Sequence, residues 1–257
     1  MRDKIINNLR EIEEKRDIKI LLAIESGSRA WGFSSADSDY YVRFIYANKP
    51  HLYITVFSDK DTIESMSEDH LFDFSGWELR KTLQLLYKSN PNLSDWLLTD
   101  KTYILNEEFL NEIRALQNVY YNPLQALYHF YNIAKKHDEV YLSKNGYTLK
   151  RFLYYLRGLL ACRYILKNSK HPPVLFDMLV EATVPELEIK KEIKELLSLK
   201  RKSKESDNNI VAKELMDYAD QMFEEYKDVI PLFRPELVKK DSRILDSFLQ
   251  KWIAESN

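Results

Sequence analysis

Residues 25–43 read ESGSRAWGFSSADSDYYVR, and this stretch decides the fold. It starts at the end of a short apolar run, IKILLAI (18–24), and leads into YYVRFIYA (40–47), which is rich in β-branched and aromatic residues. Runs of this kind are typical of buried strands. The glycine, serine and aspartate residues between them predict a loop that joins the ends of two neighbouring strands.

Two more strands and two flanking helices are predicted around this loop. The stretches HLYITVF (51–57) and HLFDFSG (70–76) are expected to form a third strand and a short fourth strand. A charged amphipathic helix precedes the first strand, and another helix follows the fourth at residues 77–88. The first third of the chain is therefore expected to mix helices with strands.

From about Trp77 onward, the periodicity of the apolar residues is almost entirely helical. The composition agrees, because 5 glycines and 8 prolines in 257 residues leave few turn formers and so favour long helices over an all-β fold. We therefore predict an α+β fold. A small mixed-sheet head is expected over residues 1–110, and an all-helical C-terminal domain over residues 111–257.

Charge and cysteine content exclude several classes of protein. The formal net charge is −2, so a nucleic acid would have to bind at a local basic patch. The single cysteine, Cys162, excludes an internal disulfide framework, and its apolar neighbours predict a core residue. The N-terminus has no apolar segment of the secretory type, and no apolar run is long enough to span a membrane. We therefore expect a cytoplasmic protein without a membrane partner.

The loop at residues 27–39 carries residue types that bind phosphates and a hard metal ion. Gly27 has no Cβ, so a phosphate can approach the backbone, where N–H groups and the Ser28 hydroxyl can hold its oxygens. Arg29 can add a charge-assisted contact. Asp39, at the start of the next strand, is expected to face the same cleft with a carboxylate that suits Mg²⁺.

The pairing of GSRAWGF (27–33) with DSDYYVRF (37–44) resembles the polymerase-β-type nucleotidyltransferase superfamily. The hallmark of that superfamily is Gly-Ser, then Asp-x-Asp, then a third carboxylate on a later strand. Within it, the chain is most similar to the RlaP-like family of bacterial and phage predicted nucleotidyltransferases linked to RNA repair. The resemblance covers residues 18–180, because GWELRK (76–81), KSNP (88–91) and KRFLYYLR (150–157) also match.

The resemblance implies a nucleotidyltransferase head, a helical second domain, and transfer of a nucleoside monophosphate from an NTP such as ATP. Two Mg²⁺ ions would assist the transfer, and the acceptor would be an RNA end or a protein. Gly27 and Ser28 would bind the triphosphate, and Asp39 would be the first metal ligand. Asp73, on the strand at 70–76, would be the third carboxylate and act as the base or as a ligand of the second metal. Its phenylalanine neighbours are expected to point to the core side.

The chain departs from the family pattern at Tyr41, where the second acid of Asp-x-Asp is expected. Residues 39 and 41 of a strand point the same way, so a phenol stands where a bridging carboxylate belongs. A neutral phenol is a poor Mg²⁺ ligand, and Asp37 lies in the turn, upstream of the strand. The resemblance therefore implies that Asp39, Asp73 and Tyr41 would be the catalytic positions, with Asp39 and Asp73 as the metal ligands. The second metal site is expected to be weak.

Two basic stretches of the helical part have both a structural and a functional interpretation. Lys150, Tyr154 and Arg157 share one helix face, which is either solvated or holds phosphates through Lys150 and Arg157. Farther along, the cluster KRKSK (200–204) is expected to be a solvated face, and contact with a nucleic acid is the minority interpretation.

Three functional hypotheses follow. The first is NTP-dependent nucleotidyl transfer, with activity weakened by Tyr41. The second is a catalytically inactive member that keeps the pocket as a nucleotide- or partner-binding module. The third is a helical interaction protein in which residues 25–43 are a structural relic. Nucleotide binding would separate the first two hypotheses from the third, and turnover would separate the first from the second.

Overall fold

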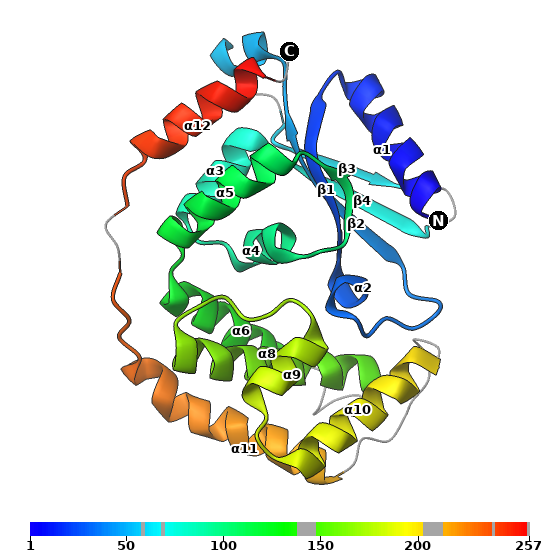
Figure 1. Cartoon of the computed structure of the whole chain (residues 1–257), viewed down its shortest axis with the longest axis vertical. Coiled ribbons are helices and arrows are strands. Elements are labelled where there is room, and N and C mark those ends of the chain that lie inside the picture. Colours follow the sequence, from blue (N-terminus) through cyan, green and yellow to red (C-terminus); the bar gives the residue numbers. More distant parts are fainter. Residues whose placement is uncertain (58–59, 68–69, 138–147, 203–212, 238–239, 256–257) are drawn as a thin grey trace. The chain divides into compact units, whose positions relative to one another are not determined.

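The computed structural model describes residues 1–57, 60–67, 70–137, 148–202, 213–237 and 240–255 (Figure 1). The chain divides into two compact units. The first unit, which we call the head, comprises Met1–Ala30, Asp39–Tyr121 and Val238–Asn257. The second, the helical unit, comprises Trp31–Ser38 and Asn122–Leu237.

A five-stranded mixed sheet with the order β3-β4-β2-β1-β5 forms the centre of the head. Its strands are β1 (Lys19–Ser26), β2 (Tyr40–Ala47), β3 (Thr62–Met66), β4 (Phe72–Glu78) and β5 (Thr102–Leu105). Strands β2 and β4 run parallel, and the other neighbouring pairs run antiparallel. The predicted α+β class and mixed sheet are therefore confirmed.

Helices cover both faces of this sheet (Figure 1). The head contains α1 (Arg2–Arg16), α2 (Gly27–Trp31, which ends at the unit boundary), α3 (Leu79–Tyr87), α4 (Pro91–Leu98), α5 (Glu107–Tyr120) and α12 (Arg243–Ala254). Val42 and Phe44 of β2 point into a core cluster shared with α1. Ile45 and Ala47 point to the opposite face, into a cluster shared with α3, α4, α5 and α12. The alternation of side chains along β2 thus separates two cores.

The structure explains residues of two short motifs, GWELRK (76–81) and KSNP (88–91). A Cβ on Gly76 would lie 2.2 Å from Cε2 of Phe44, so only glycine fits beside this ring. Asn90 caps α4, because its side chain accepts hydrogen bonds from the N–H groups of Asn92 at 3.0 Å and Leu93 at 3.1 Å. Pro91 occupies the first turn, where a missing N–H costs nothing.

The described part of the helical unit is built from helices, as predicted. Their bounds are α6 (Pro123–His137), α8 (Leu149–Asn168), α9 (Phe176–Thr183), α10 (Leu187–Lys202), α11 (Lys213–Val229) and the 3-10 turn η3 (Ile230–Leu232). Helix α8 is the centre of this unit, and Leu153, Leu156 and Leu160 on it are fully buried. Cys162 is also fully buried, which confirms its predicted role in the core, and burial raises the pKa of its thiol.

The division into units differs from the predicted boundary near residue 110 in three places. The head continues through α5, because Phe109 and Ile113 are fully buried in its core. The chain also returns to the head at its end, where Trp252 of α12 packs against Phe109 with ring centroids 5.1 Å apart. Residues 31–38, by contrast, belong to the helical unit, in which Phe33 packs on Phe176 at 5.4 Å. Long-range packing, which sequence periodicity does not report, sets all three differences.

The predicted third strand at 51–57 is wrong. Pro50–Ile54 forms the 3-10 helix η1, which starts at Pro50, and the exposed fractions of Ile54, Val56 and Phe57 are 86%, 91% and 87%. The β-branched and aromatic composition suggested a strand, but these side chains lie in solvent instead of on a core. The actual third strand, β3, and the short β5 were not predicted, because each has only four or five residues and little alternation.

Candidate functional site

The Gly27–Ser28 turn stands where β1 ends and α2 begins. Gly27 has a φ of 64°, a left-handed conformation that favours glycine. Ser28 follows at the start of α2 and is only 4% exposed. A Cβ on Gly27 would lie 3.1 Å from Cδ2 of Tyr41, so the Tyr41 ring covers the Cα of Gly27. The Tyr41 ring therefore lies directly beside Gly27, on the side where other residues carry a Cβ.

Tyr41 and Asp73 are direct neighbours on the parallel strands β2 and β4. Their side chains therefore lie on the same face of the sheet, as the sequence predicted for position 41 and the third carboxylate. Arg43, two residues farther along β2, binds the Asp73 carboxylate with its two terminal guanidinium nitrogens, at 3.2 Å and 3.1 Å. The same guanidinium lies 5.4 Å from the centroid of the Tyr41 ring. Asp73 is thus ion-paired to a cation inside the site.

Asp39 lies just before β2 and is exposed. Its backbone carbonyl accepts a hydrogen bond of 3.2 Å from Nε of Arg29. The Arg29 guanidinium stacks 3.7 Å from the centroid of the Tyr40 ring, which points to the opposite face from Tyr41. The convergence of Asp39 and Asp73 on one ion stays a prediction.

The side chains as placed do not fit the two-Mg²⁺ site that the resemblance implies. Mg²⁺ needs oxygen ligands in near-octahedral geometry, most often carboxylates together with phosphates. Among the residues that the structure describes, no three His, Cys, Asp or Glu side chains gather into a group that could hold a metal ion. Asp73 is engaged by Arg43, and a phenol stands at position 41. Among the described residues, the candidate site therefore lacks the full set of carboxylates that the resemblance implies.

Glu25 supports the site from the other face of the sheet. It is 3% exposed, and its carboxylate accepts a 3.0 Å hydrogen bond from the N–H of Tyr41 and another from the hydroxyl of Tyr103. Burial raises the pKa of Glu25, although these two hydrogen bonds and the charges of Arg29 and Lys101 act in the opposite direction. The same carboxylate also raises the pKa of Tyr103, where burial is the larger cause.

Trp31 and Phe33 of the motif pack inside the helical unit. The Arg157 guanidinium lies 4.1 Å from the centroid of the Trp31 ring, and Tyr154 packs edge-on against both Trp31 and Phe33. Arg157 is 4% exposed, and Lys150 is half-buried. The shared helix face that the sequence predicted thus holds the aromatic part of the motif, and a phosphate contact of Lys150 or Arg157 stays a prediction.

The basic end of α10 is only partly the solvated face that the sequence predicted, because Arg201 and Lys202 are exposed but Lys200 is buried. Lys200 is 2% exposed, and its amino group lies 3.0 Å from the Ser35 hydroxyl, which in turn lies 3.0 Å from the Ser38 hydroxyl. Arg201 donates to the carbonyl of Gly32 at 3.0 Å. Lys202 is exposed as expected, and position 204 lies outside the described residues. Two cations of α10 therefore anchor residues 31–38, the segment between the Gly27–Ser28 turn and Asp39.

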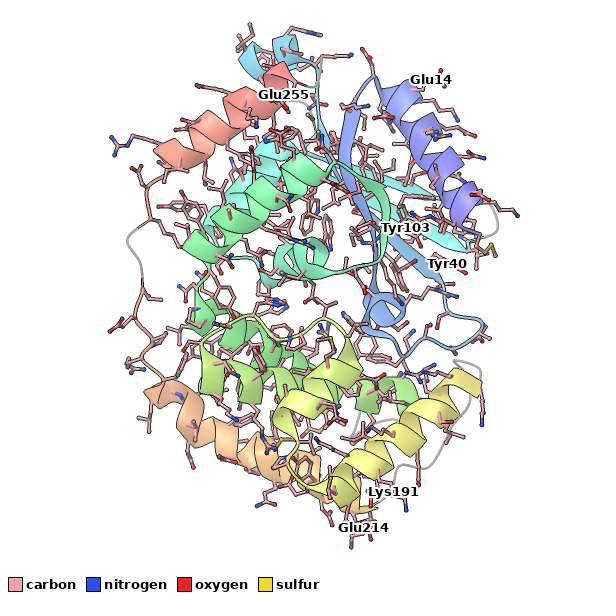
Figure 2. All side chains as sticks on the ribbon, in the orientation of Figure 1. Glu14, Tyr40, Tyr103, Lys191, Glu214 and Glu255 are labelled. Carbon is pink, nitrogen blue, oxygen red and sulfur yellow. The ribbon has the colours of Figure 1, made fainter. Side chains whose placement is uncertain are left out.

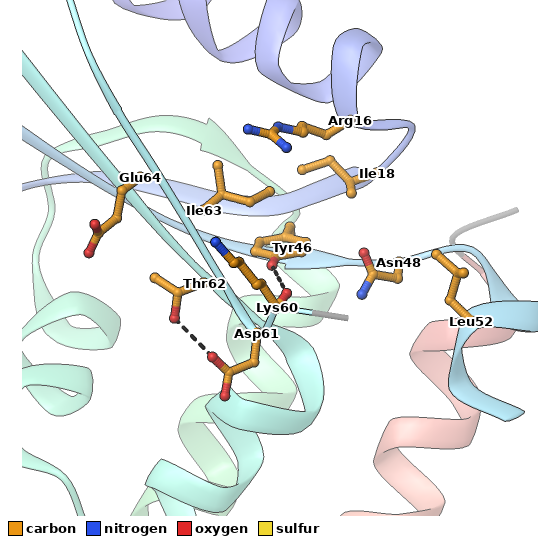
Figure 3. A pocket seen from close by; sticks show the side chains of 10 residues that line it. All are labelled: Arg16, Ile18, Tyr46, Asn48, Leu52, Lys60, Asp61, Thr62, Ile63 and Glu64. Carbon is orange, nitrogen blue, oxygen red and sulfur yellow. Dashed lines mark hydrogen bonds between the residues drawn. The ribbon is translucent and has the colours of Figure 1, made fainter. Parts of the chain in front are cut away.

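A pocket of about 830 Å³ lies on another part of the head (Figure 3). It is lined by Tyr46 near the far end of β2 and by the charged residues Arg16, Lys60, Asp61 and Glu64. Because β1 and β2 are antiparallel, this end of the sheet is opposite to the Gly27–Ser28 turn. The pocket is therefore separate from the candidate site.

Comparison with known proteins agrees with the motif at residues 27–44. The chain belongs to the RNA repair pathway DNA polymerase beta family, whose model matches residues 1–251. The family and the mixed-sheet fold indicate a polymerase-β-like nucleotidyltransferase. The resemblance that the sequence analysis stated is thus confirmed.

Two individual proteins are also similar to the chain. The uncharacterized protein YcgL of Bacillus subtilis is 42% identical over 207 residues, which cover 80% of this chain and 79% of that protein. The crystal structure of a nucleotidyltransferase-like protein from Exiguobacterium sibiricum matches 86% of this chain and 75% of its own, at 10% identity and a TM-score of 0.35. Among the described residues, no helix has both the length and the apolar character needed to cross a bilayer.

Proposed function

We propose that this chain binds an NTP at the Gly27–Ser28 turn and transfers its nucleoside monophosphate only slowly to an RNA end. The observation that carries the proposal is the placement of this turn next to Tyr41 and Asp73 at one end of the sheet. RNA is the proposed acceptor because the family is described by its part in RNA repair.

Slow transfer follows from the residues that surround Asp73. In phosphoryl transfer, the protein contributes mainly positioning and stabilisation of charge. Here the carboxylate expected at position 41 is absent, and the charge of Asp73 is balanced by Arg43. Every 1.4 kcal/mol of lost stabilisation slows a reaction about tenfold. A deficit of several kcal/mol therefore reduces turnover by orders of magnitude.

The second candidate is a binding module without turnover. It is favoured by the phenol of Tyr41 in place of a carboxylate and by the bidentate pair between Arg43 and Asp73. In this case the fold is kept for the recognition of a nucleotide or a partner, and chemistry has been lost.

The test compares the parent protein with Tyr41→Asp and Tyr41→Asn. Both variants remove the ring from Gly27, but only Tyr41→Asp adds a carboxylate. Transfer of a labelled NTP to a mixed RNA pool in Mg²⁺ buffer is expected to rise by orders of magnitude for Tyr41→Asp and to stay low for Tyr41→Asn. If the parent protein already transfers the nucleotide as fast as Tyr41→Asp does, the role given to position 41 is contradicted.

Nucleotide binding is measured by titration calorimetry in the same three proteins and in Ser28→Leu. Ser28→Leu is expected to weaken NTP binding, because it places a larger side chain at the turn. If all forms bind NTP but none transfers it to any strand of the pool, the binding module is the better description. If no form binds NTP, both candidates fail and the third hypothesis, a helical interaction protein, gains.

A further inference from the structure

A second pocket of about 470 Å³ lies behind the candidate site, on the other face of the sheet. Tyr40 and Tyr103 both line it, and Figure 2 labels this pair within the head. Tyr40 is the neighbour of Tyr41, so the two rings point to opposite faces of β2. The Tyr40 ring packs on Phe72, at 5.5 Å, within the core that α1 covers. We call this cavity the Tyr40–Tyr103 pocket.

Three cations line the Tyr40–Tyr103 pocket, and each is held by a neighbour. Arg29 stacks on the Tyr40 ring at 3.7 Å. Arg2 lies 5.5 Å from the centroid of the Tyr103 ring and donates a 2.7 Å hydrogen bond to the carbonyl of Thr102. Lys101 donates to the carbonyl of Arg29. Because these contacts order the cations in advance, a bound anion would pay less of the entropy of ordering them.

The acids of the pocket do not cancel this charge. Asp100 is exposed at the rim, and Glu25 is the one carboxylate that lies buried in the lining. Glu25 already accepts hydrogen bonds from Tyr41 and Tyr103, and its burial raises its pKa. Three cations against two acids, one of them desolvated and already hydrogen-bonded, leave a surplus of positive charge.

This arrangement matches the chemistry of single-stranded RNA. Such strands bind where cations follow the phosphates and where unstacked bases meet aromatic rings or guanidinium planes. Arg29 over Tyr40 and Arg2 over Tyr103 supply two guanidinium–aromatic pairs beside an amino group. We propose that the Tyr40–Tyr103 pocket binds a segment of the acceptor RNA strand, whose phosphates contact Arg2, Arg29 and Lys101. This inference rests on the proposed function in taking RNA as the acceptor.

The larger pocket in Figure 3 serves as an internal comparison. Arg16 and Lys60 line it together with Asp61 and Glu64, so two acids accompany its two cations. Asp61 is already paired with Lys81 at 2.8 Å. Two positive charges can therefore be removed at either pocket. The net charge of the protein changes equally in both cases, but only one change removes cations from the Tyr40–Tyr103 pocket.

The experiment uses two matched double variants of the full chain. Arg2→Gln with Lys101→Gln alters the Tyr40–Tyr103 pocket, and Arg16→Gln with Lys60→Gln alters the larger one; all four side chains are exposed. Binding of a fluorescent single-stranded oligoribonucleotide is followed by anisotropy over a range of salt concentrations, without NTP. The first double variant is expected to bind about tenfold more weakly, and its salt slope should fall by about 1.4, because each lost phosphate contact in a single strand removes about 0.7. The second is expected to match the parent protein.

Two results would overturn the inference. One is an equal loss of affinity in both double variants, which would indicate a general effect of charge. The other is competition by a free nucleoside monophosphate at the same concentration as the strand, which would indicate a mononucleotide site. The binding assay contains no NTP, so its outcome is independent of turnover. RNA binding at this pocket without transfer by any form would contradict the proposed transfer and leave the pocket assignment intact.

Discussion

The Arg43 guanidinium binds both carboxylate oxygens of Asp73, Nη1 to Oδ1 at 3.2 Å and Nη2 to Oδ2 at 3.1 Å. The two residues lie on neighbouring parallel strands, and their side chains are 18% and 30% exposed. A bidentate pair of this kind fixes geometry as well as charge. The carboxylate expected to serve catalysis is therefore part of the structural network of the sheet.

We expect a double-mutant cycle with Arg43→Gln and Asp73→Asn to give a coupling free energy of about 1–2 kcal/mol, because the pair is mostly buried and bidentate. The measurement is urea unfolding of the parent, the two single variants and the double variant. The exposed pair Lys227–Glu224 is the control and should couple by less than about 0.5 kcal/mol. Equal coupling in the two cycles would show that Arg43 and Asp73 are not held together.

Gly27→Ala is expected to destabilise the protein by about 1–2 kcal/mol, because alanine is strained at a φ of 64°. Part of this cost comes from the Tyr41 ring, which lies 3.1 Å from the position of the new methyl group. The cost of Gly27→Ala should therefore be smaller in a Tyr41→Ala background, as measured by thermal unfolding. If the loss of stability caused by Gly27→Ala is unchanged in this background, the Tyr41 ring does not hinder a side chain at position 27.

Lys200→Met is expected to loosen residues 31–38, because it removes the cation that contacts Ser35 from a buried position. The loss of this hydrogen bond should lower the free energy of unfolding by about 1–3 kcal/mol. Amide hydrogen exchange at residues 32–38 should accelerate more than exchange in the rest of the helical unit. Lys202→Met, at an exposed position on the same helix, is the matched control and should leave exchange unchanged. Similar exchange in both variants would contradict the anchoring role of Lys200.

Glu25→Gln tests the burial of the carboxyl group. A pKa raised above the ordinary value of 4.5 means that the folded state binds this proton more tightly than the unfolded state does. The contribution of Glu25 to stability is then fully present below pH 4.5 and is lost as pH rises through the raised pKa. The parent protein should therefore lose more stability than Glu25→Gln between pH 4 and pH 8, as measured by urea unfolding. Parallel pH profiles would contradict the raised pKa.

Much of the head could be predicted from residues 25–43 and the strands around them. These strands have a regular apolar pattern, and the loop between the first two carries a family motif. The apolar runs at 18–24 and 40–47 correspond to β1 and β2, and HLFDFSG (70–76) overlaps β4. Phe72 and Phe74 point to the core, as the alternation around Asp73 required. Local sequence was enough to predict these strands, because the strand, the turn and the core all require the same order of apolar and polar residues.

The contacts between distant segments could not be predicted in this way. Nothing near Lys200 in the sequence indicates that Ser35 is its partner, so its charged neighbours suggested a solvated helix. The Tyr40–Tyr103 pocket depends on β5, a strand of four residues that lacks a clear period. The ion pair between Arg43 and Asp73 depends on the parallel register of β2 and β4. Each of these features is set by tertiary packing.

Helix α12 has a consequence for how this protein is made. Its buried residues Phe248 and Trp252 complete the core formed by α3, α4 and α5, and Tyr120 donates a hydrogen bond to the carbonyl of Asp241 just before the helix. A ribosome synthesises α12 after the entire helical unit, so the head lacks part of its core until residues 243–254 have emerged. Because domains generally fold as units during synthesis, the head is expected to complete its folding only after α12 has been synthesised. The Gly27–Ser28 turn, although made early, belongs to a unit whose core is completed only after α12 has been synthesised.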